Sequence, residues 1–397
     1  MPYVGQIKAF AYNESPGPEW LLCDGSTLQI SSSIGVRALF LIIGTQYGGN
    51  GTTTFTLPDL RVINPRSSNR LNLGNGTIFR GQLYLKYYIC IDGDYPQFIE
   101  HLVPTCPCVI RTISSGNGPF YMAFDSYHSY MYVSNGLSNT VSVFDTNNYS
   151  LITTITVGNE PYGIALDNNG QLYVNNHLDD NISVINTSSN TVITTISTNS
   201  YPHGLCFDSF NNRMYVCAYL ADSVDVINTL TNTLITTIPV GTRPRQPAFA
   251  PNVNRVYVPN TTASSISVIS TLTNTVVTTI SLPSSATGCD YISSNDRIYC
   301  TLAAINKVVS IDTTTNLIVS TIDVGDTPQY MSFDFNSNIL YVSNPISNNI
   351  SVIDVNTDTV IKTIPVEEFP RDIEYDSTND RIWVANYDTD NISILCT

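Results

Sequence analysis

The chain has 397 residues and carries 17 Lys and Arg against 32 Asp and Glu, which gives a formal net charge of −15 at pH 7. At roughly 150 residues per domain, this length predicts two or three domains. The negative charge would repel phosphate backbones and anionic membrane surfaces, so nucleic acid and membranes are not expected partners.

The sequence gives no sign of a membrane anchor. The longest apolar run, residues 38–43, is far shorter than the roughly 20 residues that span a bilayer. Residues 1–20 lack the basic start and the apolar stretch of a Sec signal. Charged residues make up 12% of the chain, so Asn, Ser, Thr and Tyr must cover much of the surface. We expect a protein outside cells or on a virion surface, delivered by lysis or by a dedicated machine.

Residues 1–98 are rich in Gly-containing turns and lack the repeat that marks the rest of the chain. Four segments follow one another here: GQIKAFA (5–11), EWLLCDG (19–25), ALFLIIGTQYGGNGTTTFTLPDL (38–60) and KYYICIDGDYP (86–96). In order and spacing they resemble the phage tail-collar family, which includes the microcystin-dependent proteins of bacteria. The resemblance implies a domain that docks to other tail or appendage subunits or forms a homo-oligomer.

Within this resemblance, residues 32–43 would form a short helix with a Ser cap. After Arg61 the sequence departs from the family, because residues 62–81 lack its usual Gly and its His-containing loop. The stretch YGGNG (47–51) is not followed by Lys-Ser or Lys-Thr. We therefore interpret it as a turn with positive φ and not as a phosphate-binding loop.

A repeat of 41 or 42 residues runs through the rest of the chain. A β-branched segment closes with an Ile at Ile113, Ile155, Ile196, Ile238, Ile280, Ile322 and Ile364. An aromatic residue recurs in the same phase at Tyr132, Tyr173, Tyr215, Tyr257, Tyr299, Tyr341 and Trp383. A third segment, such as VSVFD (141–145), and a fourth that follows a Pro complete each unit. Alternating runs bounded by Asn, Asp, Gly and Pro predict strands joined by tight turns.

Four short antiparallel strands per repeat predict the blade of a β-propeller. Each strand type occurs seven times, but the segment 109–113 precedes the first complete unit and the last unit ends without its fourth strand. We therefore predict a mostly β chain with a seven-bladed propeller over 109–397, whose last blade is completed by the N-terminal outer strand at 109–113. A linker over 99–108 would join it to the collar-like domain at 1–98.

The repeat resembles the YVTN family of β-propellers. Near-matches to that motif are YVSN at 132–135 and 341–344 and YVNN at 173–176. The resemblance supports the predicted fold and implies a binding platform. It does not define a function, because one fold hosts many roles.

The repeat also places one residue of each blade at one end of the central channel, at the position that follows the blade-opening Pro in most units. These residues are Phe120, Tyr162, His203, Arg245, Thr287, Gln329 and Arg371. They could merely line a water-filled funnel. They could also form a ligand-binding mouth on an exposed rim, because aromatic faces stack on sugars and Arg forks bind carboxylates. Three residues between second and third strands are predicted on the same face: His177, Tyr219 and Tyr387.

No other pattern points to catalysis or to a cofactor. The four His residues show no paired ligand spacing, so no zinc or similar metal site is expected. Asp179 with Asp180, and Asp388 with Asp390, fall in equivalent loops and could hold Ca²⁺, although such residues usually cap turns. No carboxylate pair recurs in a way that would mark acid–base catalysis.

A disulfide is predicted where the ring closes. Cys108 and Cys396 align with Thr359 and Asp354, which flank a turn between neighbouring strands of blade six. The two cysteines should therefore face each other across a chain break and could latch the ring. Cys106 is a competing partner.

Two further cysteine pairs share a spacing of 11 residues. Cys206 with Cys217, and Cys289 with Cys300, lie on neighbouring first and second strands, but their registers differ by one residue in the repeat. Either pair could form a disulfide. The alternative is that all nine cysteines are free thiols in a protein assembled in a reducing cytoplasm.

A collar-like domain joined to a propeller predicts an assembly module that carries a recognition head. We expect a non-enzymatic tail-fibre or receptor-binding component of a phage, a tail-like particle or an extracellular appendage. The propeller would bind a host-surface glycan or protein. Two alternatives stay open: a structural subunit of an extracellular filament, and a propeller enzyme that acts on glycans as a lyase or glycosidase.

Overall fold

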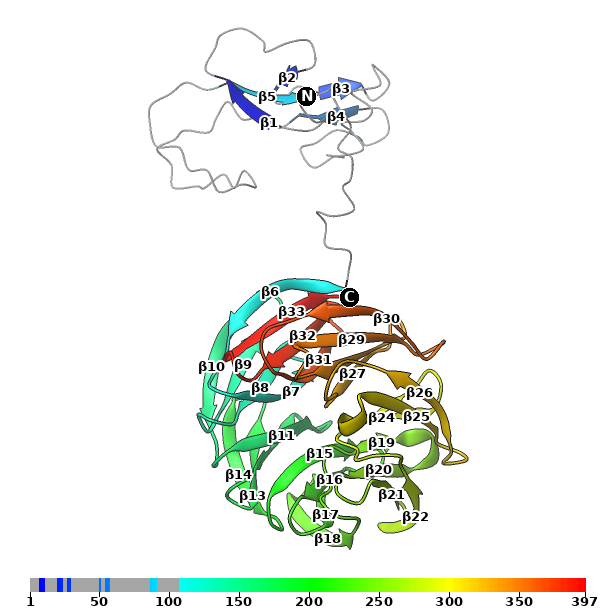
Figure 1. Cartoon of the computed structure of the whole chain (residues 1–397). Coiled ribbons are helices and arrows are strands. Elements are labelled where there is room, and N and C mark those ends of the chain that lie inside the picture. Colours follow the sequence, from blue (N-terminus) through cyan, green and yellow to red (C-terminus); the bar gives the residue numbers. More distant parts are fainter. Residues whose placement is uncertain are drawn as a thin grey trace. The chain divides into compact units, whose positions relative to one another are not determined.

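The computed structural model describes residues 7–10, 20–23, 27–29, 50, 54–57, 86–90 and 107–397. The chain divides into two compact units, Met1–Thr105 and Cys106–Thr397, and the division falls within the segment predicted as a linker. In the part of the chain that the structure describes, no helix is both long and apolar enough to cross a membrane. The elements there are mostly strands, as the sequence predicts (Figure 1).

In the first unit, short strands form two small antiparallel sheets. The larger sheet has the order β1-β5-β2, and the smaller pairs β3 with β4. Their bounds are Ile7–Phe10 (β1), Trp20–Leu22 (β2), Thr27–Gln29 (β3), Thr54–Thr56 (β4) and Lys86–Cys90 (β5). Three of the four collar-like segments thus meet in one sheet. The helix predicted at 32–43 and the divergent segment at 62–81 lie outside the described residues.

The second unit is a ring of seven four-stranded antiparallel sheets, which confirms the predicted propeller (Figure 1). Blade one contains β7 (Pro119–Asp125), β8 (Tyr130–Asn135), β9 (Thr140–Asp145) and β10 (Ser150–Thr156). Blade two contains β11 (Pro161–Leu166), β12 (Gln171–Asn176), β13 (Asn181–Asn186) and β14 (Thr191–Ser197). Blade three contains β15 (Pro202–Asp208), β16 (Arg213–Ala218), β17 (Ser223–Asn228) and β18 (Thr233–Pro239).

The remaining blades repeat this order, with two short 3₁₀ turns. Blade four contains β19 (Ala248–Ala250), η1 (Pro251–Val253), β20 (Arg255–Asn260), β21 (Ser265–Ser270) and β22 (Thr275–Ser281). Blade five contains β23 (Cys289–Ile292), β24 (Arg297–Leu302), η2 (Ala303–Ile305), β25 (Lys307–Asp312) and β26 (Ile318–Asp323). Blade six contains β27 (Met331–Asp334), β28 (Ile339–Asn344), β29 (Asn349–Asp354) and β30 (Thr359–Pro365). Blade seven contains β31 (Pro370–Asp376), β32 (Arg381–Asn386), β33 (Asn391–Cys396) and β6 (Cys108–Ser114).

Blade seven is built from both ends of the second unit, as the offset phase of the repeat predicts. Its outer strand β6 pairs antiparallel with β33 (Figure 1). Ile113 lies opposite Ile392, and both Val109 and Ile113 pack against buried apolar clusters. The closure gives β33 a hydrogen-bonded neighbour on each side and leaves no open sheet edge there.

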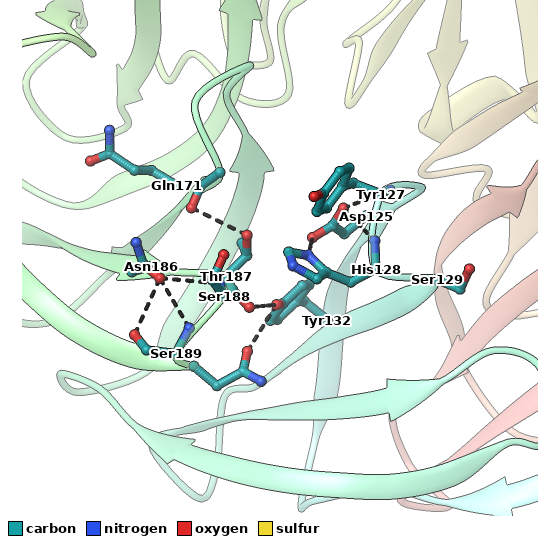
Figure 2. A network of polar contacts seen from close by, with 12 residues as sticks. Asp125, Tyr127, His128, Ser129, Tyr132, Gln171, Asn186, Thr187, Ser188 and Ser189 are labelled. Atoms are coloured by element: carbon teal, nitrogen blue, oxygen red, sulfur yellow. Dashed lines mark hydrogen bonds and ion pairs between the residues drawn. The ribbon is translucent and has the colours of Figure 1, made fainter.

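The recurring aromatic residue joins each blade to the next. Its side chain is buried in all seven blades, with an exposed fraction of 0 or 1%. The hydroxyl of Tyr132 donates to Asn190 Oδ1 at 2.9 Å, in the turn before the outer strand of blade two. Figure 2 shows Tyr132 next to Thr187 of the same turn. Tyr299 donates to Asp358 in the same way. Asn190 and Asp358 have φ of 52° and 53°, so one residue shapes the turn and satisfies a buried hydroxyl.

This pattern changes where the ring closes. Blade seven carries Trp383 in place of Tyr, and the matching turn of blade one carries Tyr149 in place of Asn. Their ring centroids are 5.9 Å apart, so an aromatic contact replaces the hydrogen bond between blades. The two departures from the repeat therefore compensate for each other at the same junction.

The two cysteine pairs with equal spacing differ in the structure. Cys289 and Cys300 are direct partners between β23 and β24 and form a disulfide, with Cα atoms 4.4 Å apart. Cys206 and Cys217 are not bonded, because Cys206 lies opposite Tyr215. The shift in register thus decides which pair can bond.

The ring-closing cysteines, Cys108 and Cys396, lie directly opposite each other. Their Sγ atoms are 3.1 Å apart, so the sulfur atoms are in contact. This distance is too long for a disulfide, and Cys396 is disulfide-bonded to a different cysteine. The predicted Cys108–Cys396 latch is therefore wrong.

Non-reducing peptide mapping is expected to recover Cys396 in a disulfide with a cysteine other than Cys108, and the competing partner Cys106 is the candidate. The chain-entropy estimate for a loop of about 290 residues is roughly 5 kcal/mol, so reduction should lower the melting temperature. A map that joins Cys396 to Cys108, or finds Cys396 alkylated before reduction, would contradict this expectation.

Candidate functional site at the channel mouth

The first residues of the inner strands form a continuous chain of contacts at one end of the channel. Phe120 and Tyr162 stack with ring centroids 3.9 Å apart, and Tyr162 lies 4.8 Å from His203. On the other side of Phe120, the guanidinium of Arg371 lies 4.4 Å from the ring centroid. Arg371 Nη1 donates to Gln329 Oε1 at 2.9 Å. Five of the seven predicted mouth residues thus touch in succession.

Arg245 joins these residues through a loop side chain. Its guanidinium lies 5.4 Å from the ring centroid of Tyr219, and Tyr219 lies 5.6 Å from His203. Thr287 takes part through its backbone, because its carbonyl accepts from the backbone N–H of Gln246 at 3.4 Å. We call the seven residues and the loop residues around them the channel mouth.

The other two loop residues also reach the channel mouth, as predicted. His177 stacks on Tyr162 with ring centroids 4.4 Å apart. Tyr387 meets Phe120 edge-on at 5.5 Å. Both inner strands and second-to-third-strand loops therefore contribute aromatic faces to one surface.

The channel mouth is more buried than the expected exposed rim. Four members have exposed fractions of 8% or less: Phe120, His203, Thr287 and Gln329. The other three, which include both arginines, are half-buried. The stacked aromatic side chains cover one another. The channel mouth is therefore a packed surface and not an open funnel.

Two tyrosines that the sequence analysis missed fill the channel directly below. Tyr121 and Tyr330 are 3% and 2% exposed, with ring centroids 4.8 Å apart. The same repeat position is Gly163 in blade two and Gly204 in blade three. A Cβ at these glycines would meet His203 O at 2.3 Å and the Gln246 Cα at 2.5 Å. The glycines therefore let neighbouring strands approach, and the tyrosines fill the space that is left.

Several polar atoms at the channel mouth have no hydrogen-bond partner in the described part of the chain. Within the described residues, Arg245 Nε, Arg371 Nε and His203 Nδ1 are buried without a hydrogen-bond partner. Burial, reinforced by the charge of Arg245, lowers the pKa of His203 well below its ordinary value, so the imidazole is neutral at pH 7. The site thus holds two fixed positive charges in a chain with a net charge of −15.

Both units match known protein families. Residues 5–64 match the Phage Tail Collar Domain, in agreement with the collar-like segments. Residues 100–233 and 309–396, more than half of the chain, match the family described as Lactonase, 7-bladed beta-propeller. The chain belongs to this lactonase family. This match is consistent with the YVTN resemblance, because the lactonase family and the YVTN family are both β-propellers.

A solved structure supports the fold of this lactonase-family propeller. The chain is similar to a chain of Kuenenia stuttgartiensis Hydrazine Synthase at 17% sequence identity and a TM-score of 0.65, over 72% of this chain and 97% of that chain. Such a distant likeness shows the fold alone. No curated protein matches the chain. Because the matched family bears an enzyme name, the expectation of a non-enzymatic protein gains no support.

Three of the four loop aspartates considered for Ca²⁺, namely Asp179, Asp180 and Asp390, serve as caps in this lactonase-family propeller. Asp179 accepts from the backbone N–H of Asn159 at 2.7 Å, and Asp390 accepts from that of Gly118 at 2.7 Å. Within the described residues, no three His, Cys, Asp or Glu side chains are placed to hold one metal ion. These carboxylates therefore fix turns at the channel mouth.

Three acidic residues on the inner strands were also missed: Asp290, Asp372 and Glu374. Asp290 and Glu374 occupy a repeat position that holds a small residue in the other five blades: Ala123, Ala165, Cys206, Ala248 and Ser332. Aligning the inner strands by the repeat would have revealed them. Asp372 takes the position of Tyr121, and its Oδ2 accepts from Met122 N at 2.8 Å.

The stability of the propeller is expected to fall as pH rises between about 4 and 8. Burial raises the pKa of Asp372 to about 8, so the folded state holds a proton that the unfolded state has lost. Over that window each pH unit costs up to about 1.4 kcal/mol. Urea midpoints of the native chain and of Asp372→Asn at pH 5 and pH 8.5 measure this. The variant should lose less stability, and an equal loss in both proteins would contradict the assignment.

Proposed function

We propose that this chain is a subunit of a phage tail or tail-like particle whose propeller binds an acidic ligand at the channel mouth. The collar domain would attach it to other tail subunits or to copies of itself. The ligand class that suits the mouth best is a host-surface glycan that carries carboxylates. In this role the protein acts on the virion or outside the cell.

The observation that carries the proposal is the pair of half-buried arginines, Arg245 and Arg371. Their Nε atoms are buried without a hydrogen-bond partner in the described part of the chain. A buried donor left without an acceptor costs free energy, so a ligand that supplies acceptors recovers it. A carboxylate fits best, because a guanidinium binds it through two parallel hydrogen bonds.

The aromatic residues favour a sugar as the carrier of the carboxylate. Phe120 and Tyr387 lie against the guanidinium of Arg371, and Tyr162 stacks on Phe120. Tyr387 is only partly buried. Flat apolar faces beside convergent polar groups are typical of small-ligand sites. The neutral imidazole of His203 adds a group that can donate or accept a hydrogen bond to a sugar hydroxyl.

A glycan array probed with the full chain tests the proposal. Glycans that carry uronate or sialate should bind, neutral glycans of the same backbone should not, and added salt should weaken binding. Selective binding of neutral glycans, or no binding, would count against it. The mass of the protein in solution separates the filament alternative, since a tail subunit predicts a closed oligomer and a filament predicts open-ended assembly.

The family match favours a second candidate, an enzyme that opens a lactone ring. His203 is neutral and lies at the channel mouth with Arg245. Burial lowers the pKa of His203, and the charge of Arg245 lowers it further. A neutral imidazole can act as a general base, and a guanidinium can stabilise an oxyanion. Acid release from sugar lactones, measured by pH-stat, should then disappear in His203→Gln. No release by the native chain would exclude this candidate.

A further inference from the structure

Below Tyr121 and Tyr330 the channel widens into a cavity of about 700 Å³. It extends toward the C-terminal ends of the inner strands, and all seven inner strands contribute to its wall. None of the seven channel-mouth residues lines it. We call it the lower cavity, and it is separate from the proposed ligand site.

The lower cavity holds carboxyl groups and no opposite charge. Asp290, Asp372 and Glu374 line it, whereas no Lys, Arg or His does among the described residues. Their oxygens accept from backbone N–H groups: Asp372 from Met122 at 2.8 Å and Glu374 from Phe124 at 3.2 Å. Burial raises the pKa of Asp290 to about 7 and that of Glu374 well above its ordinary value. A bound cation would stabilise the ionised form of these carboxyl groups and displace their protons.

Aromatic residues surround the outer end of the lower cavity. One repeat position on the inner strands is aromatic in six of seven blades: Phe124, Leu166, Phe207, Phe249, Tyr291, Phe333 and Tyr375. All but Tyr375 are partly exposed. Aromatic faces attract cations, above all organic ammonium groups. These aromatic side chains therefore suit both the methylene chain and the charge of an ammonium ligand.

Unpartnered polar groups lie at the inner end of the lower cavity. The hydroxyls of Tyr121 and Tyr330 influence each other's pKa, yet neither has a hydrogen-bond partner of good geometry in the described part of the chain. Gln246 Oε1, which also lines the cavity, is an acceptor without a donor. A ligand with N–H donors would satisfy these oxygens.

The spacing of the groups favours an extended ligand over a metal ion. Asp372 and Glu374 are two residues apart on β31, so they face the same side about 7 Å apart along the strand. From the position of Tyr121 to that of Phe124 the strand covers about 10 Å. Within the described residues, no three acidic, His or Cys side chains are placed around one metal ion.

We propose that the lower cavity binds a linear polyamine. Its ammonium groups lie against the carboxyl groups and the orphan oxygens of Gln246 and the two tyrosines. Its methylene groups lie against the aromatic rings at the outer end. Because the ligand is cationic and the cavity lies apart from the channel mouth, this inference does not depend on the proposed glycan site.

Isothermal titration of the full chain with spermidine tests the inference. We expect saturable binding at one site per chain. Glu374→Gln should weaken the affinity at least tenfold, because it removes a carboxyl group that can ionise against a bound ammonium group and keeps the shape of the side chain. Tyr291→Leu should weaken it several-fold, because it removes an aromatic face and keeps every carboxyl group.

Asp388→Asn is the matched control, since it removes the same charge from an exposed position that does not line the lower cavity. Its affinity for spermidine should equal that of the native chain. An equal loss in Asp388→Asn and Glu374→Gln, or uptake without saturation, would mean that spermidine only screens the negative surface and would overturn the inference. Competition by one Mg²⁺ per site would assign the cavity to a metal ion and would also overturn it.

Discussion

A chain that begins at residue 115 is expected to lose the cooperative thermal transition that a chain beginning at residue 106 retains. The shorter chain lacks β6, so β33 becomes an open edge and its buried residues Ile392, Ile394 and Leu395 lose cover. At about 1 kcal/mol per hydrogen bond and about 1.5–3 kcal/mol per apolar side chain, the loss is on the order of 8 kcal/mol. That is comparable to the whole stability of a typical domain.

Circular dichroism melting of both chains measures this loss. Two substitutions in the full chain provide a matched pair on the same strand. Ile113→Ser should destabilise, because Ile113 packs against the cluster of Met131, Trp383 and Ile392. Ile110→Ser should not, because Ile110 is 43% exposed. Equal melting temperatures for the chains that begin at 106 and 115 would contradict closure by β6.

The fold of the second unit could be predicted because each strand carries its own signal in every repeat. The closing Ile, the buried aromatic residue and the turn Asn recur, and the structure shows their mutual dependence in the contact between Tyr132 and Asn190. The position of the closing strand followed from counting, because the segment at 109–113 had no partners before it. Such local and repeated signals need no knowledge of side-chain packing.

The shape of the channel could not be predicted in the same way. Whether seven side chains leave a funnel depends on the volume of residues from other blades, and Tyr121 and Tyr330 fill the space that remains between the closely approaching strands. The sequence leaves both cysteine pairs open because their registers differ in the repeat, and the structure decides between them. An equal spacing of 11 residues gave a bond at Cys289 and none at Cys206, because the strand register differs.

The acidic residues of the lower cavity could be predicted in part. Asp290 and Glu374 stand out once the inner strands are aligned, because the other blades have small residues there. They do not form a recurring carboxylate pair, because each is a single acid in a different blade. Only the ring brings residues of blades five and seven to one cavity.

The double variant Arg245→Ala, Arg371→Ala is expected to weaken binding of an acidic oligosaccharide, such as an oligogalacturonate, at least a hundredfold. Each charge-assisted hydrogen bond to a carboxylate contributes about 1.5–3 kcal/mol, and both guanidinium groups are removed. The fold should persist, because the hydrogen bond that the Ser343 hydroxyl donates to the backbone carbonyl of Arg371 does not depend on the Arg371 side chain. Titration calorimetry measures the affinity, and melting checks the fold.

Two further variants decide whether geometry or overall charge is responsible. Arg111→Ala changes the net charge by the same amount per residue at an exposed position on β6, and it should leave the affinity unchanged. Arg371→Lys keeps the charge but loses the planar fork that stacks on Phe120 and binds a carboxylate with two bonds, so it should still weaken binding about tenfold. Full affinity in Arg371→Lys would point to a diffuse electrostatic attraction, and full affinity in the double variant would remove the channel mouth from the proposed function.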